Sequence, residues 1–281
     1  GTLIYILGVV DDLKDLPATV KFSWQTAVAV LMYSMGIKVQ FIHNYFGDGI
    51  LEFGTIICFV VTVLWIVGIT NTINLIDGLD GLAAGVSIIA ALSIAYVAYI
   101  HGEQFGFLLV CFVMLAVAGG AMGFLPYNFY PAKVFMGDGG SLFLGFMIAI
   151  LSVVGPLKRS TIIAVVIPVL VLGIPIFDTF FAIIRRLLNG QPIMKADKGH
   201  LHHHLMASGY GQLRAVLMLY GISADMGMAA VLVSRELYKD AFVLIVITIL
   251  YLYVFLTDPN RNVQKRQAVD IAKEERQSKH D

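Results

Sequence analysis

The sequence predicts an all-α fold, a polytopic bundle of transmembrane helices, and three observations lead to it. Of the 281 residues, 58% are hydrophobic and 14% are charged, and the mean hydropathy is +0.83. Soluble domains carry about 25% charged residues. The apolar residues form runs of about the 20 residues that a span needs, without the period-2 alternation of barrel strands. This composition excludes a soluble domain, a disordered tail and a nucleic-acid-binding protein, and makes the lipid bilayer a partner.

Eight runs are long enough to be whole spans, and we expect helices because lipid offers no partner to open backbone. They are 22–36, 55–73, 82–100, 106–125, 140–155, 162–184, 213–234 and 241–257. Residues 1–10 are apolar but too short, and they lack the charged region and cleavage site of a signal peptide. We interpret them as one partial span, the end of a truncated helix. Pro168 and Pro175 should kink or break the span that contains them.

Basic residues are unequally distributed between alternate loops. One set holds fourteen of the nineteen Lys and Arg residues and comprises 11–21, 74–81, 126–139, 185–214 and the tail 258–281. The positive-inside rule places this set in the cytoplasm. The unusual polar clusters fall on the same side, so we expect one catalytic face that is open to the cytosol and covered by the long loop 185–214. Residues 1–257 would then form a single transmembrane catalytic domain, followed by a charged cytoplasmic tail.

Two adjacent carboxylates, Asp11 and Asp12, follow the partial span. Such a pair can hold a divalent cation or raise the pKa of one of its members, although a solvated helix end explains it equally well. Lys21 lies at the entry to the next span. It is either a snorkelling interfacial lysine or a phosphate-binding group.

Four Asx residues recur every third position between two apolar spans, namely Asn71, Asn74, Asp77 and Asp80. On a helix the first three would lie along one side, and the glycines that follow would break the helix. Amide and carboxylate oxygens without thiols suit Mg²⁺ or Mn²⁺ better than zinc. A helix-to-helix turn needs only one Asx residue, so we favour a cation site.

A glycine-rich turn, GDGGS, places Asp138 directly before a span, and Asn128 precedes it in the same loop. Glycines ahead of a helix N-terminus can form a backbone cradle for phosphate oxygens. An anionic Asp there would oppose a phosphate unless Mg²⁺ bridged them. The alternative is a plain helix cap.

Two further groups of residues leave their roles open. Asp178 and Arg185 lie two helical turns apart, and they could form a local ion pair or contact the substrate. A histidine cluster could bind zinc, remain solvated, or contact a diphosphate and ribose; it comprises His200, His202, His203 and His204. Cys58 and Cys111 lie in apolar runs, so no disulfide framework or CxxC site is expected. No ATPase, dehydrogenase or serine-hydrolase motif is present.

Five motifs follow one another along this topology: GVVDD with a lysine nine residues beyond, NxxNLIDGLDGLA, FMGDGGS, IPIFD and HLHHH. Together they resemble the polyprenyl-phosphate N-acetylhexosamine-1-phosphate transferase family, up to about residue 210. The resemblance implies transfer of a sugar 1-phosphate from a UDP-sugar to a polyprenyl phosphate, with Mg²⁺ as cofactor and UMP as product. It also implies further helices upstream and a place in the bacterial inner membrane.

The histidine motif indicates a branch of this family. In the peptidoglycan phospho-N-acetylmuramoyl-pentapeptide transferase, the histidine motif ends HHH-x-Glu, whereas here Leu205 and Met206 follow the three histidines and the acidic position is missing. The resemblance is nearer to the branch that uses UDP-N-acetylglucosamine and undecaprenyl phosphate to start teichoic-acid or O-antigen-like polymers. The peptidoglycan enzyme is the alternative within the family. A divalent-cation transporter is an alternative of another class, and a zinc-dependent hydrolase would lack HExxH.

Carried over residue by residue, the resemblance makes Asn74 and Asp138 the Mg²⁺ ligands and Asp11 and Asp12 the catalytic pair. The pair either orients and deprotonates the lipid phosphate or forms an aspartyl-phosphate. The residues implied in substrate binding or site support are Lys21, Asn71, Asp77, Asp80, Asn128, Asp178, Arg185, His200, His202, His203 and His204. Asp225, inside a span, has no assigned role, and the sequence leaves a homodimer open.

Overall fold

The computed structural model describes residues 1–39, 41–43, 50–52, 54–102, 105–154, 168–188 and 211–257. Over these ranges it confirms a helical membrane protein. The helices are α1 (Thr2–Lys14), α2 (Ala18–Ser34), α3 (Thr55–Ile76), α4 (Leu82–Ile100), α5 (Phe105–Asn128), α6 (Gly137–Val153), α8 (Gly173–Leu188), α10 (Gln212–Ser234) and α11 (Tyr238–Thr257). The chain also forms two short antiparallel strands, β1 (Phe41–His43) and β2 (Ile50–Glu52), which the all-α prediction did not include.

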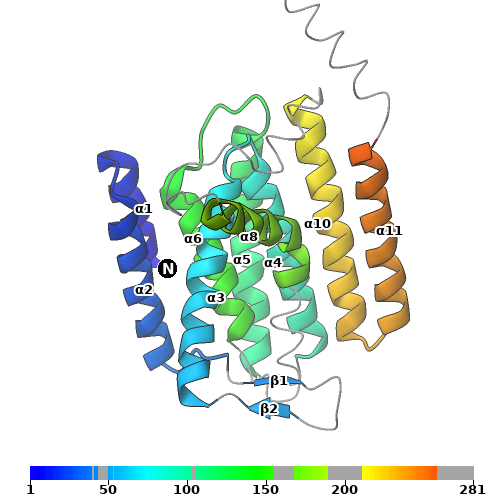
Figure 1. The fold of residues 1–281 in the computed structure, drawn as a ribbon, viewed down its shortest axis with the longest axis horizontal. Coiled ribbons are helices and arrows are strands. Elements are labelled where there is room, and N and C mark those ends of the chain that lie inside the picture. The colour runs from blue at the N-terminus through cyan, green and yellow to red at the C-terminus, as the bar shows by residue number, and fades with distance from the viewer. Residues whose placement is uncertain are drawn as a thin grey trace, which may run out of the picture.

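The number of spans differs from the prediction in the described part of the chain. Five of its helices are long and apolar enough to cross a membrane: α3, α4, α5 from Phe107, α10, and α11 to Phe255. The predicted span 162–184 is divided where it is described, because residues 168–171 are helical and Leu172 forms a turn. The break lies between the two prolines, as expected. The amphipathic helix α8 follows and lies across the other helices (Figure 1). Eight whole spans are therefore not confirmed.

The helices alternate in direction, which gathers the polar segments at one end of the bundle (Figure 1). The C-terminal ends of α1, α3 and α5 lie there with the N-terminal ends of α2, α4 and α6. The β1–β2 hairpin and the turn between α10 and α11 lie at the opposite end. Loops far apart in the sequence can therefore build one site.

Helix α6 packs closely against α1 and α3. Buried side chains of these helices form one cluster, which includes Leu7 of α1, Ile66 of α3 and Phe146 of α6. Lipid is as apolar as these side chains, so close van der Waals packing holds such helices together. A Cβ at Gly8 of α1 would lie 2.4 Å from the carbonyl oxygen of Asp138. Any larger residue there would push α1 away from the start of α6.

Candidate active site

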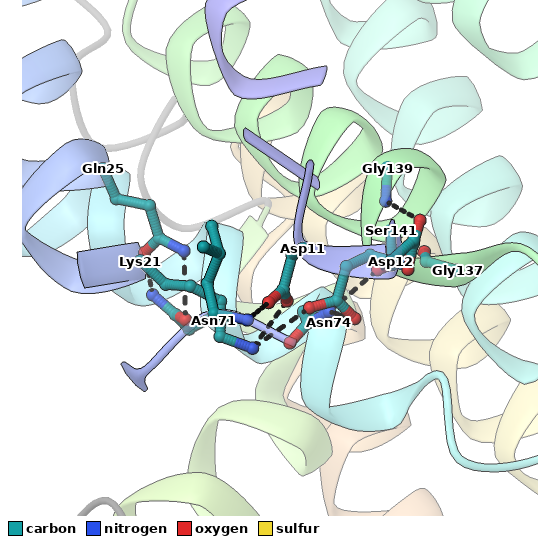
Figure 2. Close-up of polar contacts among 11 residues, drawn as sticks. Asp11, Asp12, Lys21, Gln25, Asn71, Asn74, Gly137, Gly139 and Ser141 are labelled. Carbon is teal, nitrogen blue, oxygen red and sulfur yellow. Dashed lines mark hydrogen bonds and ion pairs between the residues drawn. The ribbon is translucent and has the colours of Figure 1, made fainter. Parts of the chain in front are cut away.

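A lysine of α2 joins carboxylates of α1 and α6, residues that are far apart in the sequence. Lys21 Nζ lies 2.7 Å from Asp11 Oδ2 and 3.3 Å from Asp138 Oδ2. Figure 2 shows Lys21 and Asp11 pointing toward each other. Asp11 is only 6% exposed, and its Oδ1 accepts a hydrogen bond of 2.8 Å from the backbone N–H of Leu16. The carboxylate is therefore buried with its charge compensated.

Asn74 of α3 completes this group, which we call the lysine cluster: Lys21, Asp11, Asn74 and Asp138. Asn74 Nδ2 donates to Asp138 Oδ1 at 2.9 Å and to Ser141 Oγ at 2.9 Å. Both hydrogen bonds use the amide nitrogen, so the amide oxygen is the atom that could face a cation. The structure brings the two predicted metal ligands together, and adds Ser141, which the sequence did not suggest.

Asp12 caps the N-terminus of α6 from a different helix. Its Oδ1 accepts a hydrogen bond from the backbone N–H of Asp138 at 2.8 Å, and its Oδ2 from that of Gly139 at 3.0 Å (Figure 2). Gly137 has a φ of +66°, and a Cβ there would lie 2.7 Å from Asp12 Oδ2. Carboxylates stabilise helix N-termini. Two of the amides expected to cradle phosphate oxygens therefore bind a carboxylate in this structure.

The electrostatic environment of Asp77 disfavours another negative charge. Asp77 follows the last residue of α3. Burial raises its pKa to about 7, and the negative charges of Asp138 and Asp12 add to the shift. Crowded carboxylates with raised pKa values favour a cation between them.

Within the lysine cluster, the two carboxylates shift in opposite directions. Burial raises the pKa of Asp138, as does its hydrogen bond with Asp11, against the lowering effect of Asn74 and Lys21. Burial also opposes ionisation of Asp11, but hydrogen bonds with Asp138, Lys21 and a backbone amide bring the pKa of Asp11 below its usual value. Burial disfavours the charge on Lys21, yet both carboxylates raise its pKa. Asp11 and Lys21 are the charged pair, and Asp138 is the carboxylate that gains most from a further cation.

The donor set fits a hard divalent cation bound together with a substrate. In the ranges that the structure describes, no three His, Cys, Asp or Glu side chains are grouped so that they could hold an ion. Mg²⁺ is usually bound by one or two carboxylates, waters and substrate phosphates rather than by a complete protein cage. Asp138 and the amide oxygen of Asn74 match this pattern, because both offer oxygen.

A second polar group, which we call the loop-holding network, comprises Asp80, Gly81, Asn128 and Tyr220. Asn128 is 2% exposed; its Oδ1 accepts from the Gly81 N–H at 3.1 Å and its Nδ2 donates to the Val134 carbonyl at 3.0 Å. Asp80 Oδ2 accepts from a loop amide, the N–H of residue 132, at 3.0 Å. The Tyr220 hydroxyl donates to the Gly81 carbonyl. Two predicted substrate-binding residues therefore hold the 129–136 loop against the start of α4.

Asn71 turns toward α2 rather than toward the lysine cluster. Its Nδ2 donates to Gln25 Oε1, and Gln25 Nε2 lies 3.4 Å from Asn71 Oδ1 (Figure 2). Gln25 is 2% exposed. Asn71 and Asn74 therefore bind different helices, although the sequence predicted that Asn71, Asn74 and Asp77 would line one side. Gln25 and Tyr220 were missed because neither belongs to a polar motif.

The remaining predicted site residues are less fully described. Arg185 lies in the last turn of α8, and Asp178 lies on the same helix with its side chain outside the described residues. The histidine cluster lies wholly outside them: His200, His202, His203 and His204. Cys58 and Cys111 are buried free thiols, as expected.

The sequence was then compared with known proteins. The family model of glycosyl transferase family 4 matches residues 1–156, more than half of the chain. The chain belongs to this family. The matched region contains every residue of the lysine cluster.

Relatives within the family carry related names. A Bacillus subtilis (strain 168) protein named probable undecaprenyl-phosphate N-acetylglucosaminyl 1-phosphate transferase is 48% identical over 88% of this chain and 68% of its own length. Decaprenyl-phosphate N-acetylglucosaminephosphotransferase of Mycolicibacterium smegmatis is 34% identical over 78% of this chain and 58% of its own. Phospho-N-acetylmuramoyl-pentapeptide-transferase of Listeria innocua is 32% identical over 77% of this chain and 67% of its own length. The chain therefore spans about two thirds of these relatives or less.

Proposed function

We propose that the protein transfers N-acetylglucosamine 1-phosphate from UDP-N-acetylglucosamine to undecaprenyl phosphate and releases UMP. The observation that carries the proposal is the lysine cluster, in which four helices bring an ammonium group, two carboxylates and an amide together at one end of a membrane bundle. The higher identity to the Bacillus protein, 48% against 32% for the Listeria protein, favours this acceptor and sugar over the peptidoglycan reaction.

Asn74 and Asp138 are the proposed protein ligands of Mg²⁺. The bound ion would neutralise the diphosphate of the UDP-sugar and the departing UMP. Asp77 lies beside this site, and its raised pKa marks the place as one that needs positive charge.

Lys21 is the proposed contact of the chain with the substrate phosphates. A lysine ammonium is a compact point charge suited to phosphate oxygens. Asp11 holds this ammonium at 2.7 Å, so the incoming phosphate would meet a lysine that is already oriented.

The contacts of the predicted catalytic pair favour direct transfer. Asp11 binds Lys21 and a backbone amide, and Asp12 binds two amides of α6, so neither carboxylate is presented as a nucleophile. In direct transfer, an oxygen of the lipid phosphate bonds to the sugar-bearing phosphorus. The bond from that phosphorus to the bridging oxygen breaks, and UMP leaves with the electron pair.

The proposed location is the cytosolic side of the bacterial inner membrane. The end of the bundle that holds the lysine cluster carries loops 11–21 and 126–139, which belong to the set of segments with fourteen of the nineteen Lys and Arg residues. The positive-inside rule, which counts Lys and Arg, assigns that set to the cytosol. We keep residues 1–257 as one catalytic domain and 258–281 as its tail.

The test follows UMP release by the full-length, detergent-solubilised protein with UDP-N-acetylglucosamine, undecaprenyl phosphate and Mg²⁺. We expect release that needs the lipid, stops with EDTA and is lost in Asp138→Asn. The matched control is Asp240→Asn, the same chemical change at an exposed position in the first turn of α11. UMP from another UDP-sugar alone would move the protein to another branch. Silence with every UDP-sugar in a folded sample would overturn the proposal and make cation transport the next assay.

A further inference from the structure

Helix α2, which carries Lys21, buries one polar side chain. Three residues of α2 are buried in the described structure, namely Gln25, Val28 and Ala29, and of these only Gln25 can form hydrogen bonds through its side chain. Lipid is as apolar as valine or alanine, so packing of these two side chains gives little preference for one alignment of the helix over the next. The alignment of α2, and with it the position of Lys21, therefore depends on directional polar contacts.

Gln25 makes such a contact with Asn71 of α3. Asn71 Nδ2 donates to Gln25 Oε1, and Gln25 Nε2 lies 3.4 Å from Asn71 Oδ1, so the two carboxamides face each other in opposite orientations. Asn71 Nδ2 also donates to the carbonyl of Val67 at 2.8 Å, which fixes the way its amide turns. A single buried polar side chain can specify the register of packed helices. A shift of α2 by one residue would separate the two amides and leave their polar atoms unsatisfied.

The amide pair lies one helical turn away from the lysine cluster on both helices (Figure 2). Gln25 follows Lys21 by four residues on α2, and Asn71 precedes Asn74 by three on α3. The two helices run in opposite directions (Figure 1), so both steps lead away from the site, by about 5–6 Å at 1.5 Å per residue. In the lysine cluster, Lys21 Nζ and Asn74 Nδ2 lie 3.3 Å and 2.9 Å from oxygens of Asp138. A displacement at the amide pair would therefore change the distance from the ammonium to Asp138.

We propose that Gln25 and Asn71 are positioning residues, which hold α2 at the depth and rotation where the Lys21 ammonium reaches Asp11 and Asp138 together. The inference rests on the role proposed above for Lys21. The lysine stem is flexible, so in a displaced helix the ammonium would stay with the nearer carboxylate, Asp11 at 2.7 Å, and lose Asp138. Asn71, predicted as a substrate contact, would then act on the phosphates only through Lys21.

The first test compares UMP release per folded molecule among variants of the full-length protein in detergent. Gln25→Leu should lower kcat/KM by about tenfold to a hundredfold, because a misplacement of about 1 Å can cost about a hundredfold in rate. The double variant Gln25→Leu with Asn71→Leu leaves neither amide unsatisfied, so it should melt near the wild-type temperature and still be impaired to a similar degree. The exchanged pair, Gln25→Asn with Asn71→Gln, keeps both carboxamides and should recover most of the activity. The matched control is Thr26→Val, because the Thr26 hydroxyl bonds within its own helix, to the Phe22 carbonyl.

Combination with Lys21→Ala separates positioning from general damage. If Gln25 acts through Lys21, Gln25→Leu should cause no further fall in kcat/KM once the lysine is absent. A merely structural role would lower the activity by the same factor with and without Lys21, because independent effects add as free energies.

A labelling measurement follows Lys21 without any substrate. An amine-reactive reagent should modify Lys21 slowly while two carboxylates hold its ammonium, and the exposed Lys14 of α1 provides the reference in the same sample. By mass spectrometry, we expect the ratio of Lys21 to Lys14 modification to rise several-fold in Gln25→Leu and to stay unchanged in Thr26→Val.

The outcomes distinguish this inference from the proposed function. An unchanged labelling ratio in Gln25→Leu would overturn the inference, as would normal kcat/KM in the double leucine variant or an exchanged pair no more active than Gln25→Leu. Faster labelling of Lys21 in Gln25→Leu, in a protein that releases UMP from no UDP-sugar, would overturn the proposed function and support the positioning of Lys21 by the amide pair.

Discussion

Two polar regions lie at the same end of this bundle and both contain aspartate and asparagine side chains, yet these side chains bind different kinds of partner. In the loop-holding network, Asp80 and Asn128 bind backbone groups of the chain. In the lysine cluster, Lys21 and Asp138 bind other ionisable or amide side chains. The first arrangement fixes a loop, whereas the second leaves charged atoms whose energies change when an ion or a phosphate arrives.

The NLIDGLDG segment contributes to both regions. Asn74 donates a hydrogen bond to Asp138 of the lysine cluster, and Asp80, six residues on, binds a backbone amide of the 129–136 loop. A shared motif therefore does not imply a shared role. The difference predicts that variants of the lysine cluster lose activity while folded, and that variants of the loop-holding network lose stability.

The largest effect is expected for Lys21→Ala. The change removes the point charge from the phosphates and leaves the buried Asp11 without its partner, so kcat/KM should fall by on the order of a thousandfold. Lys21→Arg should not restore it, because a planar guanidinium cannot place one nitrogen between two carboxylates as an ammonium does. UMP release by folded protein measures this, with Lys239→Ala at the opposite end as the control. Near-normal activity in Lys21→Ala would remove the contrast between the two regions.

Asp12 offers a sharper test of this contrast. It binds backbone amides, as the side chains of the loop-holding network do, but one of those amides belongs to Asp138 of the lysine cluster. Asp12→Ala should lower kcat by about tenfold to a hundredfold and destabilise the protein by about 1 kcal/mol through loss of the cap on α6. Asp12→Asn keeps an oxygen acceptor and should recover most of both. Steady-state kinetics and thermal unfolding of the pair measure this. If the asparagine variant is as inactive as the alanine variant, Asp12 is the nucleophile and the aspartyl-phosphate route is favoured.

Much of the fold could be predicted because a membrane span is recognised from about 20 consecutive, mainly apolar residues. Residues 82–100 were predicted as a span, and α4 has these bounds. Helix α3 runs three residues past its predicted end at Ile73 to Ile76, because α2 and α6 provide partners for the amides in its last turns. The orientation of α8 follows from packing and amphipathicity, so counting apolar residues could not predict it.

The site was predictable in its residue types but not in its bonds. Asp11, Lys21, Asn74 and Asp138 stand out as polar residues at span boundaries. That Asp12 caps α6 is a contact across 127 positions to Gly139, which no periodicity encodes. Tyr220 carries no sequence feature that distinguishes it from the other aromatic residues of the spans.

Asn128→Ala should act on the loop-holding network alone. The change leaves the Gly81 N–H and the Val134 carbonyl without their partner, which costs about 1–3 kcal/mol for each buried group that stays unsatisfied. We expect a melting temperature lower by several degrees in detergent, with kcat per folded molecule little changed. An unchanged melting temperature together with a large loss of kcat would instead place Asn128 in substrate binding.

The smallest expected effect concerns Asp77, which lies between the two regions in the sequence, and it is a pH dependence. With its pKa raised to about 7, Asp77 is protonated in much of the metal-free protein at neutral pH, and a divalent cation has to displace that proton. The affinity for Mg²⁺ should therefore fall by up to about tenfold for each pH unit below 7 and level off above it.

In the metal-free protein, the free energy of unfolding changes with pH in the opposite direction. The folded state binds this proton more tightly than the unfolded state, so the contribution of Asp77 is lost as the pH rises from about 4 to about 7. Asp11, whose pKa is lowered, affects stability only below this window. Titrating Mg²⁺ against melting temperature at about pH 6, 7 and 8 measures the coupling. Asp77→Asn should flatten it, and a pH dependence that persists in that variant would assign the proton to another group.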